Sequence, residues 1–261
     1  MPRFAANLTM LFTERPFLER FAAARAAGFR HVEFLFPYAF EKARLRDLLE
    51  ANGLAQVLFN LPAGDWGAGD RGLAADPARE TEFRRGVDLA VDYARALGVM
   101  RLNCLAGVRP PNFSEAEATA TLVDNIIYAA DVLAGHGRTL LLEAVNAFDS
   151  PDFLLHRTDQ VEKIITAVDR PNVAIQYDVY HAQRAGENPT ATVGEHIDHI
   201  GYIQIADAPG RHQPGTGELD FPLLFTELDR LGYDGYVGLE YVPEPDTASS
   251  LAWIKEMGLR L

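Results

Sequence analysis

Short apolar runs alternate along the chain with longer segments whose apolar residues recur at helical spacing. The runs rich in apolar and β-branched residues predict eight strands: Phe4–Leu8, His31–Phe36, Gln56–Asn60, Arg101–Leu105, Leu140–Val145, Val173–Asp178, Tyr202–Ile205 and Tyr236–Tyr241. Apolar residues at positions i, i+3, i+4 and i+7 predict helices over Phe17–Ala27, Leu45–Asn52, Glu82–Leu97, Glu115–Ala134, Thr158–Val168, Pro222–Leu231 and Ala248–Met257. Glycines such as Gly53 and Gly98 follow these helices, where a left-handed residue ends a helix. The pattern therefore predicts a strand–helix alternation along the whole chain.

This alternation indicates an α/β fold with a parallel sheet, because strands that are apolar nearly throughout are covered on both faces. Eight units in 261 residues correspond to about 33 residues each, the usual size of a βα unit. We therefore predict a single (β/α)8 TIM barrel, formed by one domain over residues 1–261. An open doubly wound sheet is the alternative, although no G-x-G-x-x-G motif follows the first strand.

Composition and charge narrow the range of partners. The net charge of −13 disfavours nucleic acid and anionic membrane surfaces. Cys104 is the only cysteine, which excludes an internal disulfide and a thiolate zinc cluster and suits a reducing compartment. The first residues, Met1–Glu14, contain neither a recognisable export signal nor the ~20 apolar residues of a membrane span. We expect a cytoplasmic protein without a membrane partner, and either a monomer or a homo-oligomer is compatible with the sequence.

Four consecutive predicted strands each end in a side chain with an oxygen donor: Glu143, Asp178, Gln204 and Glu240. They are separated by about one βα unit, so in a barrel they converge on the rim formed by the C-terminal strand ends. Buried carboxylates are costly unless they are paired or bound to metal. An oxygen-only set favours a hard divalent cation, Mg²⁺ or Mn²⁺, over Zn²⁺. Any one of these residues alone is better explained as a surface or helix-capping residue, and their common register is what favours a site.

Other candidates lie in the connections that follow these strands. His181 comes three residues after Asp178, as a substrate contact or as an ordinary histidine at a helix start. Arg211 can present a guanidinium group to an anionic substrate, or it can be a solvated arginine. The glycines of Pro214–Glu218 are a weak phosphate-binding signal, because the P-loop lysine is absent. The long connection Leu61–Arg79 follows the third strand, where we expect a functional loop on the rim.

Six stretches of the chain resemble a known family: Arg3–Leu8, Val32–Tyr38, Asn60–Trp66, Arg101–Leu105, Ile175–His181 and Gln204–Glu218. Over nearly its full length the chain is similar to the hydroxypyruvate isomerase family of the xylose-isomerase-like barrels. The resemblance implies a small 2-oxo or hydroxy acid substrate, with hydroxypyruvate converted to tartronate semialdehyde. It implies that Glu143 and Glu240 transfer protons, and that Glu143, Asp178, Gln204 and Glu240 bind a metal. Related sugar epimerases generally have histidine at the position of Gln204, so the sequence leaves the metal requirement open.

Such an isomerisation moves a carbonyl group by one carbon through an enediolate, and two carboxyl groups can carry the proton. On this hypothesis His181 and Arg211 orient the substrate. A sibling family, 2-oxo-tetronate isomerase, shares the opening segment and the Glu33–Tyr38 run, whereas the third, sixth and seventh strand motifs resemble the hydroxypyruvate enzymes more. A sugar 3-epimerase is a further alternative. A metal-dependent endonuclease would need a basic face and many histidines, of which the chain has seven. A non-catalytic sugar-acid binding module would need the pocket but would not need both glutamates.

Overall fold

The structure of the protein, a computed structural model, describes residues 3–261. Its strands are β1 (Arg3–Asn7), β2 (His31–Glu33), β3 (Ala55–Asn60), β4 (Arg101–Cys104), β5 (Thr139–Glu143), β6 (Val173–Asp178), β7 (Ile200–Ile205) and β8 (Tyr236–Leu239). Each strand pairs in parallel with the next, and β8 pairs with β1, where Arg3 lies opposite Tyr236. The sheet is therefore a closed (β/α)8 barrel, as predicted, and not an open sheet. Met1 and Pro2, the first residues of the segment Met1–Glu14 considered above, lie outside the described residues.

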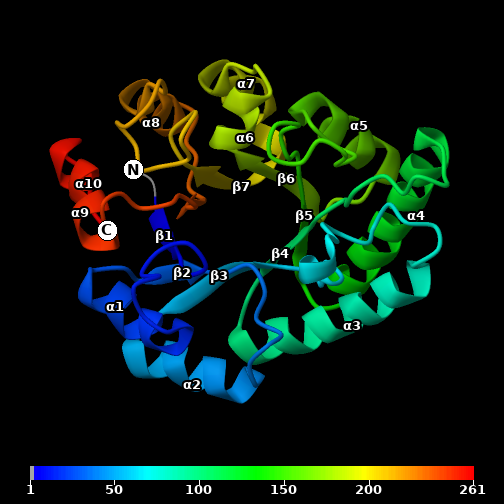
Figure 1. Cartoon of the computed structure of the whole chain (residues 1–261), viewed down its shortest axis with the longest axis horizontal. Helices are drawn as coiled ribbons and strands as arrows, with labels where there is room; N and C mark the ends of the chain where they lie inside the picture. Colours follow the sequence, from blue (N-terminus) through cyan, green and yellow to red (C-terminus); the bar gives the residue numbers. More distant parts are fainter. Residues whose placement is uncertain (1–2) are drawn as a thin grey trace.

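The helices surround the barrel, and the C-terminal helices come round to the first helix (Figure 1). They are α1 (Arg20–Ala26), α2 (Lys42–Asn52), α3 (Glu80–Leu97), α4 (Glu115–Ala134), α5 (Thr158–Val168), α6 (Val179–Arg184), α7 (Pro189–His196), α8 (Phe221–Arg230), α9 (Thr247–Ser250) and α10 (Ala252–Glu256). Residues 3–261 also contain three short 3-10 helices: η1 (Phe17–Glu19), η2 (Trp66–Ala68) and η3 (Ile197–His199). In the described part of the chain, no helix has the length and apolar character needed to cross a membrane.

The observed bounds differ from the predicted ones where local features override the apolar pattern. The helices α4 and α5 have the predicted bounds, and a capping box between Ser114 and Glu117 marks the start of α4. The helices α6 and α7 were not predicted, because they are too short to show a helical period. The strand β2 ends at Glu33 instead of Phe36, since its register with β3 shifts between Val32 and Glu33.

Side chains fill the barrel in layers that follow the two-residue period of the strands. An apolar layer contains Ala5, Val57, Leu141 and Tyr202, which come from alternate strands. The next residues toward the C-terminal strand ends are polar and buried, and they include Glu33, Asn103 and Gln176. Two residues beyond Leu141 and Tyr202, on the same face of their strands, stand Glu143 and Gln204. The strand geometry thus places the predicted oxygen donors directly above a polar layer.

The connection between β3 and α3 lies on the rim, as predicted. Its middle forms η2, where the carboxylate of Asp65 accepts a hydrogen bond from the Ala68 backbone N–H. Its second half is tied to the end of β4, because Ala75 N–H donates to the carbonyl of Ala106. Gly72 is in the left-handed region at φ 131°, and a Cβ atom there would lie 2.3 Å from the Leu105 carbonyl oxygen. This close backbone contact holds the connection against the mouth of the barrel.

Candidate active site

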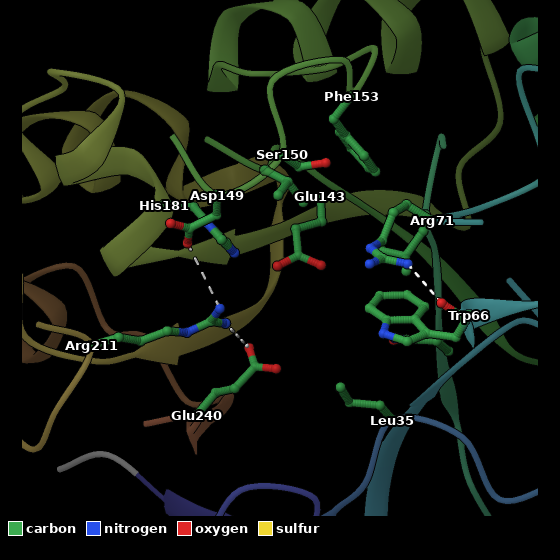
Figure 2. Close-up of a pocket in the computed structure, with 13 residues that line it drawn as sticks. Leu35, Trp66, Arg71, Glu143, Asp149, Ser150, Phe153, His181, Arg211 and Glu240 are labelled. Carbon is green, nitrogen blue, oxygen red and sulfur yellow. Dashed lines mark hydrogen bonds and ion pairs between the residues drawn. The ribbon is translucent and has the colours of Figure 1, made fainter. Parts of the chain in front are cut away.

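A cavity of about 210 Å³ opens at the C-terminal rim of the barrel. Figure 2 shows the side chains that point into it from strand ends and from the rim connections. Four of the six predicted site residues line this cavity: Glu143, His181, Arg211 and Glu240. The other two, Asp178 and Gln204, are buried and lie next to these residues at the ends of β6 and β7. The structure therefore brings together all six residues that were selected from the sequence.

Glu143 ends β5 and is held by two amide donors from neighbouring strands. Asn103 Nδ2 and Gln176 Nε2 each donate to Glu143 Oε2 at 2.9 Å. Burial, together with the negative charge of Asp178, raises the pKa of Glu143 to about 8, although Arg211 acts to lower it. Its second oxygen, Oε1, is not used by these amides. A carboxyl group that titrates near neutral pH can take up and release a proton during catalysis.

Asp178 ends β6 and also caps the helix that follows. Its Oδ1 atom accepts hydrogen bonds from the backbone N–H groups of Tyr180 and His181 at 2.8 and 3.3 Å. Burial raises the pKa of Asp178 to about 6, against the lowering effect of Arg211. His181 lies one turn later with Nε2 3.7 Å from Asp178 Oδ2, and its Nδ1 lies 2.6 Å from Asn146 Nδ2. Burial and the nearby Arg211 lower the pKa of His181 well below its usual value, so the ring is neutral.

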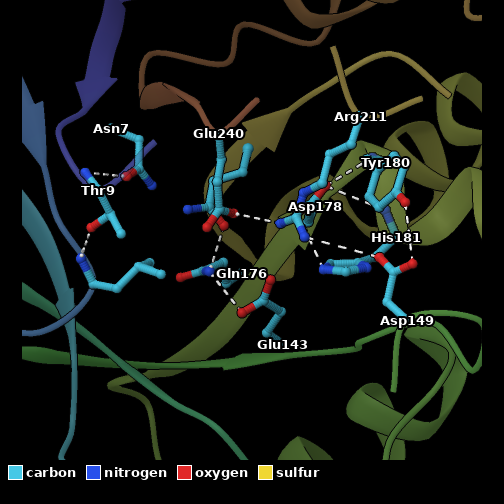
Figure 3. Close-up of polar contacts among 12 residues, drawn as sticks. Asn7, Thr9, Glu143, Asp149, Gln176, Asp178, Tyr180, His181, Arg211 and Glu240 are labelled. Atoms are coloured by element: carbon cyan, nitrogen blue, oxygen red, sulfur yellow. Dashed lines mark hydrogen bonds and ion pairs between the residues drawn. The ribbon is translucent and has the colours of Figure 1, made fainter. Parts of the chain in front are cut away.

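Arg211 lies among three acidic side chains (Figure 3). Its guanidinium nitrogens are 3.5 Å from Glu240 Oε2, 3.8 Å from Asp178 Oδ2 and 3.9 Å from Asp149 Oδ2. Burial raises the pKa of Glu240 well above its ordinary value; Arg211 opposes this, whereas Asp178 and Glu143 add to it. The guanidinium also lies over the ring of Tyr180, 5.0 Å from its centroid. Arg211 is therefore a partly buried, ion-paired arginine and not a solvated one.

Gln204 is the penultimate residue of β7, and hydrogen bonds fix both ends of its side-chain amide. Its Oε1 accepts from Gln176 Nε2 at 2.6 Å, and its Nε2 donates to Glu33 Oε1 at 2.9 Å. Asn7 Nδ2 and the hydroxyl group of Tyr202 also donate to Glu33. Burial raises the pKa of Glu33 to about 7, against the lowering effect of these donors. The amide of Gln204 is thus oriented by a buried acid that sequence analysis did not select.

The arrangement fits a divalent cation. Ligand atoms of Glu143, Asp178 and His181 lie within 4.8 Å of one another. Among residues 3–261, Asp178 Oδ2 is buried and has no hydrogen-bond partner, as do Asn103 Oδ1 and Gln176 Oε1 nearby. Oxygen donors with one imidazole suit several divalent ions, Mg²⁺ and Mn²⁺ among them. The site therefore has the composition of a metal site, and Asp178 Oδ2 is a buried, unpartnered oxygen within it.

The glycines of Pro214–Glu218 have a structural role that explains the weak phosphate signal. The buried carboxylate of Asp207 accepts hydrogen bonds from the backbone N–H groups of Gly215 and Gly217, both at 2.8 Å. It also accepts from the N–H groups of Ala208 and Leu219. These amides are therefore occupied by an acid of the same chain and are not available to cradle phosphate. The turn holds the segment that contains Arg211, whose own φ is 59°.

Sequence reasoning missed several residues that shape the site. The polar layer residues Glu33 and Gln176 were missed, although Gln176 precedes Asp178 by two residues and so shares its face of β6. Trp66 and Arg71 line the cavity from the connection that was expected on the rim. No residue pattern identifies them, because the path of that connection over the barrel depends on tertiary contacts. Asp149, in the connection after β5, was missed for the same reason.

Comparison with known proteins agrees with this geometry. A family model described as a xylose isomerase-like TIM barrel matches residues 21–257. The chain is 47% identical over 255 residues to a 2-oxo-tetronate isomerase of Cupriavidus necator, with 98% of both chains covered. It is 48% identical over 254 residues to a hydroxypyruvate isomerase of Escherichia coli, covering 97% of this chain and 98% of the relative. A crystal structure from Brucella melitensis, described as an AP endonuclease of family 2, has a TM-score of 0.95 at 44% identity, covering 98% and 99% of the chains.

The barrel, the acidic site at its C-terminal rim and these relatives define the class of protein: it is an isomerase built on a (β/α)8 barrel. The relatives named isomerase match nearly the whole length of the chain. The chain belongs to the xylose isomerase-like TIM barrel family. More distant likeness, such as that to a D-allulose 3-epimerase from Methylomonas with a TM-score of 0.76 at 22% identity, extends to the fold alone.

Proposed function

We propose that this protein interconverts hydroxypyruvate and 2-hydroxy-3-oxopropanoate (tartronate semialdehyde). The observation that supports this most directly is that Glu143 and Glu240, from β5 and from the end of β8, line the same cavity. Their carboxyl groups point into it from two sides (Figure 2). Burial raises the pKa of Glu143 to about 8 and raises the pKa of Glu240 well above its ordinary value, so both carboxyl groups are suited to taking up and releasing a proton. Two such groups are what a proton transfer between adjacent carbons requires.

The reaction needs no net gain or loss of atoms. One carboxylate removes a proton from C3 of hydroxypyruvate, and the electron pair forms the C2–C3 double bond of an enediolate. The C2 carbonyl oxygen takes up the negative charge of the enediolate. The other carboxyl group returns a proton to C2, and the proton of the C3 hydroxyl passes to the C2 oxygen as the aldehyde forms at C3. In this scheme Glu143 and Glu240 move the protons. His181 and Arg211 hold the substrate oxygens in place, because both line the cavity beside these acids.

In the same proposal, a Mg²⁺ or Mn²⁺ ion is held by Glu143, Asp178, Gln204 and Glu240. When bound, such an ion stabilises negative charge on the substrate oxygens. The free Oδ2 of Asp178 supports this ligand set, whereas Gln204 would bind through Oε1, which accepts a hydrogen bond from Gln176 in this structure. His181 is an additional donor within reach of Glu143 and Asp178.

A four-carbon substrate, 2-oxo-tetronate, is the second candidate, because a relative named for that activity is as similar to the chain as the hydroxypyruvate isomerase. The chemistry would be the same. An endonuclease activity, which the description of the Brucella structure suggests for that protein, is disfavoured by the net charge of −13 and by the acidic lining of the cavity. A metabolic enzyme acting on a small acid also suits the cytoplasmic location that we propose from the single, buried cysteine.

The experiment that tests the function compares two substrates with and without chelator. Purified protein is mixed with hydroxypyruvate or with 2-oxo-tetronate, in Mg²⁺, Mn²⁺ or EDTA, and products are followed by NMR or by a coupled NADH-dependent reductase. Preferred turnover of hydroxypyruvate supports the main proposal, and preferred turnover of 2-oxo-tetronate supports the second candidate. Loss of turnover in EDTA supports a requirement for a bound divalent metal ion. Binding of these acids without turnover would overturn the catalytic proposal and indicate a binding module.

A further inference from the structure

The cavity contains two arginines in different states of charge compensation. Arg71 and Arg211 are the cationic side chains among those that line it within residues 3–261. Figure 2 shows them on opposite sides, with Glu143 between them. Arg211 is ion-paired with Glu240, Asp178 and Asp149, so much of its charge is compensated. The two guanidinium groups therefore differ in how readily they can accept an anion.

Arg71 forms no such ion pair, although its charge is near enough to Asp70 to help lower the pKa of that carboxyl group. Its Nη1 donates to the carbonyl oxygens of Trp66 at 3.1 Å and of Asp70 at 2.8 Å. The carboxylate of Asp70 is bound to Arg79 at 2.7 Å, and Arg71 forms no ion pair with any carboxylate of residues 3–261. No residue in that range accepts a hydrogen bond from its Nε or Nη2. One edge of the guanidinium fork is thus unused.

The conformation of Arg71 is nevertheless well fixed. The guanidinium carbon lies 4.2 Å from the centroid of the Trp66 ring, and Trp66 packs in turn against Phe36 with ring centroids 5.5 Å apart. The stacking and the two carbonyl bonds hold the plane of the guanidinium group at the cavity wall. A charged group that is already ordered loses little conformational entropy when it binds a ligand.

We propose that Arg71 binds the carboxylate of the substrate and so selects 2-oxo acids over neutral sugars. The free Nε and Nη2 hydrogens lie on one edge of a planar group, the geometry that binds a carboxylate through two parallel hydrogen bonds. This inference rests on the proposed function, because it assumes an acid substrate, and it adds the residue that recognises the acid.

The charges at the bottom of the cavity favour a substrate whose carboxylate lies at Arg71. An ionised Asp178, and whichever of Glu143 and Glu240 is the carboxylate that removes the proton, repel an anion, so a substrate carboxylate is best placed away from them. Arg71 lies across the cavity from Arg211 and offers such a place (Figure 2). With its carboxylate bound there, the rest of a short chain extends toward Glu143 and Glu240. The acid group then acts as an anchor and takes no part in the proton transfer.

The test measures binding and turnover separately in Arg71→Gln, Arg71→Lys and the control Arg109→Gln. Arg109 lies on a neighbouring rim connection and lines a different hollow. Calorimetry measures the binding of D-glycerate, which has the carboxylate but lacks the reactive 2-oxo group, and of glycerol, its neutral counterpart. Turnover is measured with hydroxypyruvate. Thermal melting confirms that each variant is folded.

We expect Arg71→Gln to weaken D-glycerate binding by roughly 10- to 100-fold, the range for a charge-assisted hydrogen-bonded pair. The D-glycerate affinity of Arg71→Lys should lie between that of the wild type and that of Arg71→Gln, because lysine keeps the positive charge but cannot form two parallel hydrogen bonds. KM for hydroxypyruvate should rise more than kcat falls, since the carboxylate is bound equally in the ground and transition states. Arg109→Gln should behave as the wild type, and glycerol should show no dependence on Arg71.

Two results would overturn the assignment: equal D-glycerate binding by the wild type and a folded Arg71→Gln variant, or no binding by the wild type. Failure of the proposed function would look different. If D-glycerate binding depends on Arg71 while neither hydroxypyruvate nor 2-oxo-tetronate is turned over, the carboxylate site stands and the reaction assigned to it is wrong.

Discussion

Glu33 on β2 and Gly238 on β8 share one place inside the barrel. A Cβ atom on Gly238 would lie 2.6 Å from both carboxylate oxygens of Glu33. The missing side chain at Gly238 therefore leaves the space in which Glu33 reaches the amide of Gln204. A glycine and an acid, 205 positions apart in the chain, together position a residue of the proposed metal site.

We predict that Gly238→Ala lowers the free energy of unfolding by about 1–3 kcal/mol, the usual effect of overpacking a core. Urea denaturation followed by circular dichroism measures this. The control is Gly194→Ala in α7, where a Cβ atom would lie 3.4 Å from Glu227 Oε1, an ordinary distance. That variant should be as stable as the wild type or slightly more stable, because alanine favours a helix interior. Equal stability of the wild type and Gly238→Ala would contradict the shared-space interpretation.

The two glutamates at the cavity give a direct test of proton transfer. We expect Glu143→Gln and Glu240→Gln each to lower kcat by at least ~10², because glutamine keeps the shape but cannot exchange a proton. Steady-state kinetics with the substrate identified by the assays above measures this, and melting curves check the fold. Glu227→Gln, at an acid on the outer helix α8, serves as a control that should keep wild-type kcat. Near-wild-type turnover in either site variant would refute its assignment.

Buried Glu33 should make stability depend on pH. Its pKa is raised to about 7 in the folded protein, whereas an unfolded glutamate titrates near 4.3. The folded state keeps its proton over this interval while the unfolded state loses it, so stability falls as pH rises through the interval. Glu33→Gln removes that contribution and leaves the other titrating groups in place.

We therefore expect the stability of Glu33→Gln relative to wild type to increase from about pH 4.5 to about pH 7 and then to level off. Urea midpoints of both proteins in EDTA, at half-unit pH intervals, measure the difference. Histidines such as His181, whose contribution has the opposite sign, cancel in the comparison. A difference that is constant over this interval, or that shrinks, would show that Glu33 does not titrate as described.

The rim turn that contains Arg211 depends on Asp207, whose carboxylate binds four backbone N–H groups. Asp207→Ala should lower the free energy of unfolding by about 2–4 kcal/mol, since several amides lose a charged acceptor at once. It should also raise KM, because Arg211 loses its support. The matched change Asp220→Ala removes one helix N-cap outside the site and should cost about 1 kcal/mol without affecting KM. Similar kinetics in both variants would argue against the supporting role.

Much of the site was predictable because strands have a simple geometry. Successive side chains alternate between the two faces, and parallel strands end on the same rim, so Glu143, Asp178 and Gln204 could be placed together from sequence. The same rule applied one step earlier along β6 would have selected Gln176. The helices α6 and α7 were missed because the helical period cannot be recognised over six or eight residues.

The sequence by itself determined the barrel, its strand ends and the oxygen donors there, because these follow from apolar periodicity and from the length of a βα unit. Only the tertiary structure decided which charges meet. The pairing of Arg211 with Glu240 and Asp178, the unpaired Arg71 and the space that Gly238 leaves for Glu33 all involve residues from separate units. Their contacts depend on the closure of the barrel and on the path of the rim connections, which long-range packing determines and local sequence does not.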